Sequence, residues 1–398
     1  MNLYILSIIA FVTFLILFLL LLLAFTKSNE KISSWSLLTV FLFIASILSW
    51  WSDDMTLRWV FLEATSLVSA LLISLSRTEK SIEVAWQFLL LNSFGLGLAF
   101  MGLIILSYGI HSSVTMNTFE IMKLIPSHQN LLVEAGLWLT VFGYSSKLGL
   151  FPNHFWVTNT YSESPSQISA MLSSLVSTSV CIALRPILQM DALYTDKHFS
   201  SSFGLLILGL MTIVYSLWVA YESLDIRKVF SQIALMHSGM LAVVLYLNLP
   251  DNVFYYILGG NILTKALLFT SLGIFRIDSG TRNIQDIKNS NSISKIASYL
   301  LFITFGVSFI VPFSPIFVTD LIILKSAVSL GKFWVILVLI LPIIFFLVLL
   351  YKFFPILGFP YRPIKEGYEK AMQRRIIFCI LLLLLLVSYG FYGLFNFL

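Results

Sequence analysis

The sequence predicts an all-α polytopic membrane protein with about twelve transmembrane helices. Hydrophobic residues make up 59% of the 398 residues and charged residues only 11%, whereas charged residues make up about 25% of a typical soluble domain. The mean hydropathy is +0.95. Long runs of Leu, Ile and Val continue without the alternation that a transmembrane β-barrel strand requires, so helices are expected to be the spanning elements.

Twelve apolar runs have roughly the length that crosses a bilayer, about 20 helical residues. The first run follows Met1 without a basic region and is too long for the core of a signal peptide, so we expect a retained helix. The runs cover residues 3–25, 35–50, 56–75, 84–109, 131–161, 165–188, 203–221, 229–248, 253–275, 296–330, 333–350 and 376–397.

Two of these runs are too long to be simple helices. Run 131–161 contains Pro152, and run 296–330 contains Pro312 and Pro315. Proline removes a backbone donor and kinks or breaks a helix. Each of these runs is therefore expected to be one discontinuous crossing.

Basic residues are distributed unequally between the two ends of the predicted bundle. One end carries sixteen of the 24 lysines and arginines: Lys27, Lys31, Arg77, Lys80, Arg227, Lys228, Arg276, Arg282, Lys288, Lys295, Lys352, Arg362, Lys365, Lys370, Arg374 and Arg375. The other end carries six: Arg58, Lys123, Arg185, Lys197, Lys325 and Lys332. Cytoplasmic loops are enriched in Lys and Arg, so both termini are predicted to lie outside and the basic loop 352–375 in the cytosol.

The order of the runs also predicts an internal repeat. The second to sixth runs and the seventh to eleventh runs each have a broken fourth member with an ionisable residue, Lys147 in one set and Asp320 in the other. Because five is odd, the second set enters the membrane from the opposite side, as in inverted-topology repeats. The predicted organisation is an N-terminal helix in 1–30, a first five-helix repeat in 31–190, a second in 200–350, and the basic loop and last helix in 351–398.

Five ionisable residues fall at membrane depth on five different runs: Glu63, Lys147, His237, Lys265 and Asp320. Charges there cost about 2.5–3.5 kcal/mol on insertion scales and are functional candidates by default. Loss of hydration makes a lysine easier to deprotonate, and histidine passes protons in either direction. The row is interpreted as a proton wire. Further polar residues are expected to support it by holding water: Tyr144, Ser145, Ser146, His154, Glu163, Thr178 and Asn261.

Structural alternatives remain open for four members of the row. Glu63 can snorkel from a helix start, and Lys147 can form a purely structural salt bridge. His237 can be a packed hydrogen-bonding residue, and Asp320 can pair with Lys325 five residues later.

No motif in the sequence indicates catalytic or cofactor chemistry. Cys181 and Cys379 lie inside apolar runs without metal-ligand spacing, and no nucleophile–base constellation or glycine-rich phosphate loop is present. We expect no cofactor, no metal, no nucleic-acid partner and no redox catalysis by this chain itself. The lipid bilayer is its expected surrounding.

Five blocks of the sequence, in order, resemble a known family. They are FLEATSLVSALLISLSRTEKSIEVAWQFLLLNSFGLGLAFMGL, SKLGLFPNHFWVTNTYSESPSQISAMLSS, DIRKVFSQIALMHSGM, NILTKALLF and PFSPIFVTDLIIL, within about residues 56–330. They are similar to the antiporter-like membrane subunits of respiratory complex I (NADH-quinone oxidoreductase), of energy-converting membrane-bound hydrogenases and of Mrp-type cation/proton antiporters. The wording ATSLVSALL and SESPSQISAMLSS looks closest to the hydrogenase branch.

The resemblance implies a role for each member of the row. The family's helix-embedded glutamate falls on Glu63, its paired lysine on Lys147 and its central histidine on His237; the second-half lysine falls on Lys265 and the terminal acid on Asp320. The resemblance implies a proton-translocating or Na⁺/H⁺ antiporter-like, non-catalytic subunit in the inner membrane of a prokaryote. Its implied partners are other membrane subunits and a peripheral soluble module.

Three features depart from the family pattern. Thr178 stands where many relatives carry a further lysine, Thr158 and Asn159 replace a Pro-Asp pair, and Glu63 lies on the third predicted crossing rather than the fifth. A trimmed subunit is therefore expected, with water or another residue linking the two halves. Three other functions stay open: a proton-conducting partner of a peripheral enzyme, as in inorganic-carbon uptake systems, a scaffold without transport, and a free-standing secondary carrier.

Overall fold

The computed structural model describes residues 32–110, 116–125, 130–194, 198–289, 295–309, 311–357 and 370–398. Its helices are α2 (Ile32–Trp51), α3 (Met55–Ser74), α4 (Glu79–Gly109), α5 (Thr118–Leu124), α6 (Leu131–Leu148), α7 (Phe155–Glu163), α8 (Ser166–Met171), α9 (Ser177–Leu193), α10 (Ser201–Glu222), α11 (Ile226–Leu247), α12 (Asp251–Ser279), α13 (Ile284–Asn289), α14 (Lys295–Val307), α15 (Pro315–Ser329), α16 (Val335–Val338), α17 (Ile340–Leu357) and α18 (Lys370–Phe397). A π-helical segment, η1 (Leu172–Val176), joins α8 to α9. The predicted helix at 3–25 lies outside the described residues.

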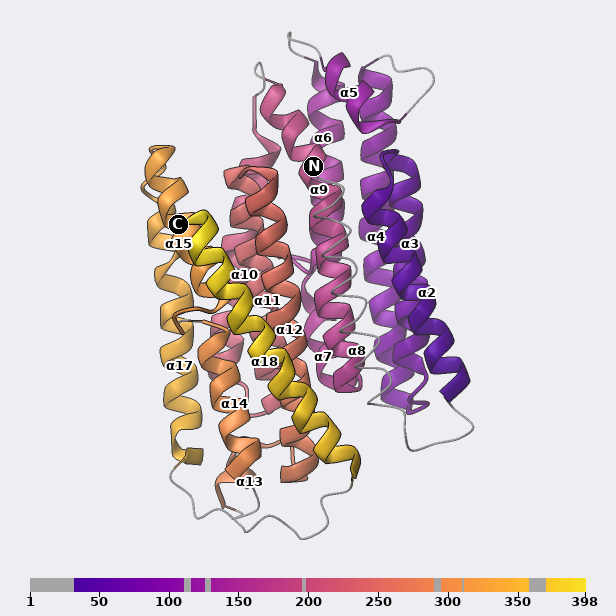
Figure 1. The fold of residues 1–398 in the computed structure, drawn as a ribbon. Coiled ribbons are helices and arrows are strands. Elements are labelled where there is room, and N and C mark those ends of the chain that lie inside the picture. The colour runs from indigo at the N-terminus through magenta and orange to yellow at the C-terminus, as the bar shows by residue number, and fades with distance from the viewer. Residues whose placement is uncertain are drawn as a thin grey trace.

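The helices form an elongated bundle in which most axes run roughly along one direction (Figure 1). Nine helical segments of the described chain are long and apolar enough to cross a membrane. The prediction of an all-α multi-pass membrane protein is confirmed. The two interrupted runs, α6–α7 and α14–α15, are not among these nine: α7, α14 and α15 are shorter than 18 residues, and α6 has 18 residues but includes Glu134 and Lys147. The count of twelve crossings therefore stays a prediction.

The first predicted break is confirmed, and glycine and proline explain it. α6 ends at Leu148, and Gly149 follows with a left-handed φ of 82°, which glycine adopts without strain. The amide of Leu150 donates to the Ser145 carbonyl at 3.0 Å, which closes the helix end. Pro152 then prevents the helix from resuming before α7.

The second break frees one particular carbonyl. α14 ends at Val307, and α15 begins at Pro315 with Ser314 as its N-cap. A continuous helix would bond the Ser308 carbonyl to the amide of residue 312, but Pro312 has no N–H. The Ser308 carbonyl is therefore available to a side chain from another helix.

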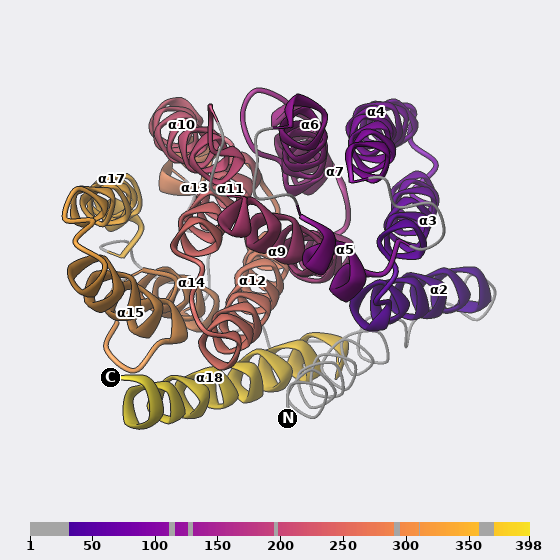
Figure 2. The same ribbon diagram turned by 90° about the horizontal axis from the view of Figure 1, so that it is seen from above.

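Three helical segments form the centre of the bundle. All residues in the apolar part of the segment Ser166–Leu193 are buried. The buried share is 94% in α11 and 89% in α12, against 28–44% in the other spans. Seen from above, α9, α11 and α12 lie among the other helices, while the strongly tilted α18 runs along one side (Figure 2). Polar side chains on these three segments are therefore shielded from lipid by the rest of the protein.

Two isolated antiparallel bridges lie at opposite ends of the bundle. Near α5, Asp54 pairs with Asn117; near α13, Asp225 pairs with Asn283 (Figure 1). In each pair the aspartate caps the helix that follows it, α3 or α11, and the asparagine side chain accepts a hydrogen bond from a nearby amide. This correspondence is compatible with an inverted repeat. The repeat and the domain limits stay predictions.

The predicted basic loop at 352–375 is wrong at both edges. Residues up to Leu357 continue α17, and α18 already begins at Lys370, while residues 358–369 lie outside the described part. Lys352 contributes to this extension because its ammonium donates to the carbonyls of Ala220, at 2.7 Å, and Tyr221, at 2.9 Å, at the end of α10.

Candidate functional site

Glu63 and Lys147 meet the same turn of α3 without forming a direct ion pair among the described residues. The Lys147 ammonium is buried and donates to the Leu62 carbonyl at 2.7 Å and to the Ser66 hydroxyl. Glu63 accepts a hydrogen bond from the Ser93 hydroxyl of α4 at 2.6 Å, and its other carboxylate oxygen is buried without a partner. Lys147 thus contacts the residue next to Glu63 in the sequence, but each of the two charged groups is hydrogen-bonded to a different serine hydroxyl.

Lys265 lies at the centre of the bundle and is held by two serines. Its ammonium, 1% exposed, donates to Ser177 of α9 at 3.3 Å and to Ser238 of α11 at 3.2 Å. No carboxylate forms an ion pair with it in the described chain. Both contacts are long, so neither serine fixes the ammonium in one position.

The π-helical segment η1 lies beside Lys265. It packs against α12 and against α3, and its serines Ser173 and Ser174 are fully buried. π-helical turns often occur at functional sites because the wider turn leaves backbone groups unpaired. Thr178, at the predicted link between the halves, donates to the Ser174 carbonyl at 2.8 Å. Hydroxyl groups therefore line the region between the helices that carry the two lysines.

His237 is oriented by the second helix break. Its Nε2 lies 2.9 Å from the Ser308 carbonyl oxygen that Pro312 leaves free. A carbonyl only accepts hydrogen bonds, so Nε2 carries a proton and donates it. The other ring nitrogen, Nδ1, is buried without a partner and in the neutral ring is an acceptor.

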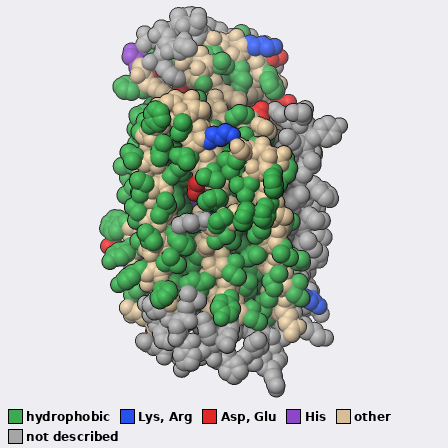
Figure 3. All heavy atoms as spheres, turned by 60° about the vertical axis from the view of Figure 1, so that its left-hand side comes forward, with side chains coloured by type: hydrophobic (Ala, Val, Ile, Leu, Met, Phe, Trp, Pro, Cys, Tyr) green, Lys and Arg blue, Asp and Glu red, His purple; other side chains and the backbone are tan. Residues whose placement is uncertain are grey.

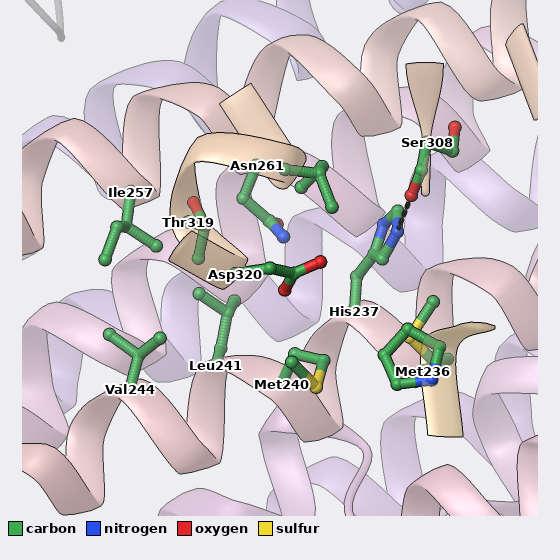
Figure 4. A pocket seen from close by; sticks show the side chains of 12 residues that line it. Met236, His237, Met240, Leu241, Val244, Ile257, Asn261, Ser308, Thr319 and Asp320 are labelled. Carbon is green, nitrogen blue, oxygen red and sulfur yellow. Dashed lines mark hydrogen bonds between the residues drawn. The ribbon is translucent and has the colours of Figure 1, made fainter. Parts of the chain in front are cut away.

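A cavity of about 20 Å³ joins His237 to Asp320 and is also lined by Asn261, Ser308 and Thr319 (Figure 4). The Asp320 carboxylate points toward the Asn261 amide and the His237 ring. His237 Nδ1, Asn261 Oδ1 and Ser308 Oγ are buried without hydrogen-bond partners. This volume has room for one water, which needs two to four polar partners.

Asp320 also reaches the side of the bundle. It is partly exposed, whereas His237, Asn261, Ser308 and Thr319 are buried, and it makes no ion pair in the described residues. The face on the side of α15 and α17 is largely hydrophobic, with an acidic group in a hollow near its middle (Figure 3). Lys325, the alternative partner, donates instead to the carbonyls of Phe397 and Leu398, at 3.3 and 3.2 Å.

The predicted supporting residues near Lys147 are buried but differ in their contacts. Ser146 accepts a hydrogen bond from Asn153 at 3.1 Å, and Ser145 donates to the carbonyl of its own helix. Tyr144 is 2% exposed. Both ring nitrogens of His154 are buried without partners, and its ring lies 3.8 Å from that of Tyr215, between centroids.

Glu163 lies apart from the other candidates. Its carboxylate forms ion pairs with Lys80, at 2.9 Å, and with Arg282, at 3.1 Å, at the basic end of the bundle. These contacts tie the start of α4 and the segment after α12 to the end of α7. The structure does not bring Glu163 together with the cavity or with either buried lysine.

The sequence reasoning missed the hydroxyls that contact the charges directly. These are Ser66, Ser93, Ser177 and Ser238. Ser308 was missed as well, and it contacts His237 through its carbonyl oxygen. Serines inside otherwise apolar helices were the available signal, because a hydroxyl in lipid or in a bundle core needs a partner. Which charged group each serine contacts depends on how the helices pack together, and the spacing of residues in the sequence does not reveal that packing.

Comparison with known proteins identifies relatives over most of the chain. Residues 52–345 match the family described as "NADH:quinone oxidoreductase/Mrp antiporter, TM". The hydrogenase-4 component F homolog of Methylacidiphilum infernorum is 26% identical over 69% of this chain and 59% of its own length. NADH-quinone oxidoreductase subunit N of Leptospira interrogans is 24% identical over 63% of this chain and 49% of its own length. The chain thus spans about half to three-fifths of these curated relatives.

Solved structures share the fold at low sequence identity. A chain of an archaeal membrane-bound sulfane sulfur reductase has a TM-score of 0.78 at 20% identity, with 98% of this chain and 77% of that chain covered. A chain of respiratory complex I from Thermus thermophilus has a TM-score of 0.74 at 17% identity, covering 97% and 83%. A chain of the Mrp complex from Dietzia sp. has a TM-score of 0.78 at 14% identity, covering 97% and 81%.

Proposed function

The chain belongs to the NADH:quinone oxidoreductase/Mrp antiporter transmembrane family, and from that premise we propose that it moves protons across the membrane as one subunit of a larger energy-converting complex. The observation that carries the proposal is the set of ionisable groups, each on a different helix and each beside hydroxyl groups or a polar cavity: Glu63, Lys147, His237, Lys265 and Asp320. Apolar packing alone needs none of these charges, and each is costly in a membrane.

The proposed path uses one group at a time. In the first half, Lys147 gains and loses a proton under the influence of Glu63, and hydroxyls of α3 and η1 lead toward Lys265. In the second half, Lys265 exchanges protons with His237 Nδ1 through Ser238 or water. One water in the cavity then connects His237 with Asp320. The Thr178 position needs no lysine in this scheme because serine hydroxyls and water complete the link.

The proposed partners follow from the relatives and from the site. The similar solved chains come from multi-subunit membrane complexes. Asp320 of α15 is partly exposed, and the side of the bundle formed by α15 and α17 is largely hydrophobic (Figure 3), so a neighbouring membrane subunit would cover both. We propose that this side contacts another membrane subunit and that a peripheral soluble module supplies the driving reaction. Sodium in place of protons is the alternative ion.

The proposed function can be tested with a variant whose larger apolar side chain fills the cavity between His237 and Asp320. Asn261→Leu removes the amide and occupies the space of a bridging water, so proton uptake by proteoliposomes of the purified complex should fall about tenfold or more. Ile257→Leu, at an apolar wall of the same cavity, keeps the volume and should leave uptake unchanged. Equal uptake by both variants would contradict a water-mediated path, and uptake that follows Na⁺ instead of pH would identify sodium as the ion.

The orientation is proposed from the charge asymmetry of sixteen basic residues against six. We expect α13 on the cytosolic side of a prokaryotic inner membrane and α5 outside. Cys181 and Cys379 are buried, so single cysteines at exposed Gln285 and Lys123 can be labelled with a membrane-impermeant maleimide. In intact cells Lys123→Cys should react and Gln285→Cys should not; the reverse pattern would place both termini inside.

A further inference from the structure

A cavity of about 320 Å³, lined by both charged and apolar side chains, opens at the end of the bundle where α2 meets α3. Its lining includes Trp50, Asp53, Arg58, Arg185, Asp251 and Tyr255. This end is opposite to the one that carries Glu163 and its two basic partners. None of the five residues of the proposed proton path lines it.

The walls of this cavity are fixed by backbone hydrogen bonds. The amide of Met55 donates to the Met116 carbonyl at 3.0 Å. The amide and hydroxyl of Thr118 both donate to the Asp53 carbonyl, at 2.9 and 2.6 Å. These bonds attach the short helix α5 to the turn between α2 and α3. The segments that form the cavity walls are therefore held in a fixed arrangement.

The two arginines of the cavity differ in their partners. Arg185 is satisfied: its Nε and Nη2 donate to Asp251 at 3.0 and 2.5 Å, and Nη2 also donates to the Leu249 carbonyl at 2.6 Å. Arg58 is only 7% exposed, yet within the described part of the chain its guanidinium donates only to the Ser52 carbonyl, and its Nε is buried without a partner there. A guanidinium has five N–H donors and stays charged. Arg58 therefore lacks a multivalent acceptor.

The charged and aromatic side chains around the cavity indicate what kind of ligand it can bind. Asp53 is exposed at the rim, so a ligand that brings an anion to Arg58 can also place a cation near a carboxylate. Trp51 and Phe119, which also line the cavity, are 52% and 64% exposed, and aromatic side chains of this kind mark the membrane interface. A ligand with a phosphate, an ammonium group and apolar chains fits these features.

We propose that this cavity binds the headgroup of an amine-bearing zwitterionic phospholipid, with the phosphate at Arg58 and the ammonium group near Asp53. The acyl chains lie along the exposed apolar surface of α2 and α3. Phosphate, like carboxylate, accepts hydrogen bonds from several guanidinium donors at once, and every phospholipid headgroup carries one. An amine without a phosphate would leave Arg58 unsatisfied, and an anionic lipid without an amine would leave Asp53 unused.

The test measures which lipid the purified protein complex retains. It is incorporated into nanodiscs that contain equal amounts of phosphatidylethanolamine and phosphatidylglycerol, released into detergent, and examined by native mass spectrometry. The parent should retain phosphatidylethanolamine preferentially. Asp53→Asn keeps the backbone carbonyl that holds α5 and should lower this preference about fivefold, whereas Asp286→Asn, at an exposed position on α13, should not change it.

Two further arms make every outcome decisive. Arg58→Gln should lose retention of both lipids; if it does not fold, the Asp53 comparison alone decides. Soluble O-phosphoethanolamine at millimolar concentration should not displace the lipid, and displacement would assign the site to a free phosphoamine instead. The proposal is wrong if the parent retains both lipids equally or retains neither, or if Asp53→Asn keeps the parent's preference for phosphatidylethanolamine.

Discussion

Replacing Lys147 with Met is expected to reduce proton translocation by about 10²-fold or more, the usual contribution of a positioned proton-transfer group. The ammonium of Lys147 makes hydrogen bonds only to the Leu62 carbonyl and the Ser66 hydroxyl among the described residues. Methionine retains the apolar stem but neither binds nor releases a proton. Initial rates of pH change in proteoliposomes of the purified complex, with subunit content checked on gels, provide the measurement.

A second variant separates charge from proton exchange at the same position. Lys147→Arg keeps a positive charge and several donors, but arginine does not lose its proton in proteins. If Lys147 is only structural, the arginine variant should assemble and translocate protons at nearly the parent rate. If Lys147 exchanges protons, arginine should be as inactive as methionine. Lys123→Met, at an exposed position on α5, serves as the control.

Glu63→Gln isolates the influence of the carboxylate charge on Lys147. Glutamine can still accept the hydrogen bond from Ser93, so packing between α3 and α4 should survive while the charge is lost. Because the structure has no direct ion pair between Glu63 and Lys147, removal of the Glu63 charge should cost less stability than the roughly 3–5 kcal/mol lost when a directly bonded buried pair is broken. Loss of transport without loss of thermal stability would support coupling at a distance, and normal transport would show that Glu63 is structural.

The long apolar runs and the prolines made the fold largely predictable from the sequence. Pro152 and Pro312 each remove an amide that a continuous helix would need, and both predicted breaks are present. Helix starts were harder. α4 begins at Glu79, five residues before the predicted start, because Thr78 and Ser81 form a reciprocal capping box with two 3.1 Å hydrogen bonds.

The short helices α5 and α13 were not predicted because distant segments help to hold them in place. The Asp53 carbonyl accepts two hydrogen bonds from the start of α5, and the Ile226 amide donates to the Arg282 carbonyl just before α13. These bonds link residues far apart in the sequence, so no local pattern announces them. The same holds for the candidate site: the charged residues stood out as exceptions in apolar runs, whereas their serine partners depend on which helices pack together.

Lys265 tests the difference between a proton path and a scaffold most directly. It is 1% exposed, its two serine contacts are longer than 3.1 Å, and no described carboxylate compensates its charge. In a scaffold, Lys265→Met would remove the cost of burying an ammonium group and should be neutral or stabilising by about 1–4 kcal/mol. In a proton path, the same gain in stability should accompany loss of transport.

We therefore expect the Lys265→Met complex to assemble, to melt at the same or a higher temperature than the parent, and to translocate protons about 10²-fold more slowly. Asp320→Asn should likewise slow transport without preventing assembly, because Asp320 is partly exposed and forms no ion pair among the described residues. Lys228→Met, which removes an exposed lysine of α11, is the matched control and should change neither quantity. Thermal unfolding and pH-gradient formation are measured on the same preparations, since each hypothesis predicts a different combination. A Lys265→Met complex that is more stable and translocates protons at the parent rate would show that the buried charge is not on the path, and that the chain is a scaffold at its centre.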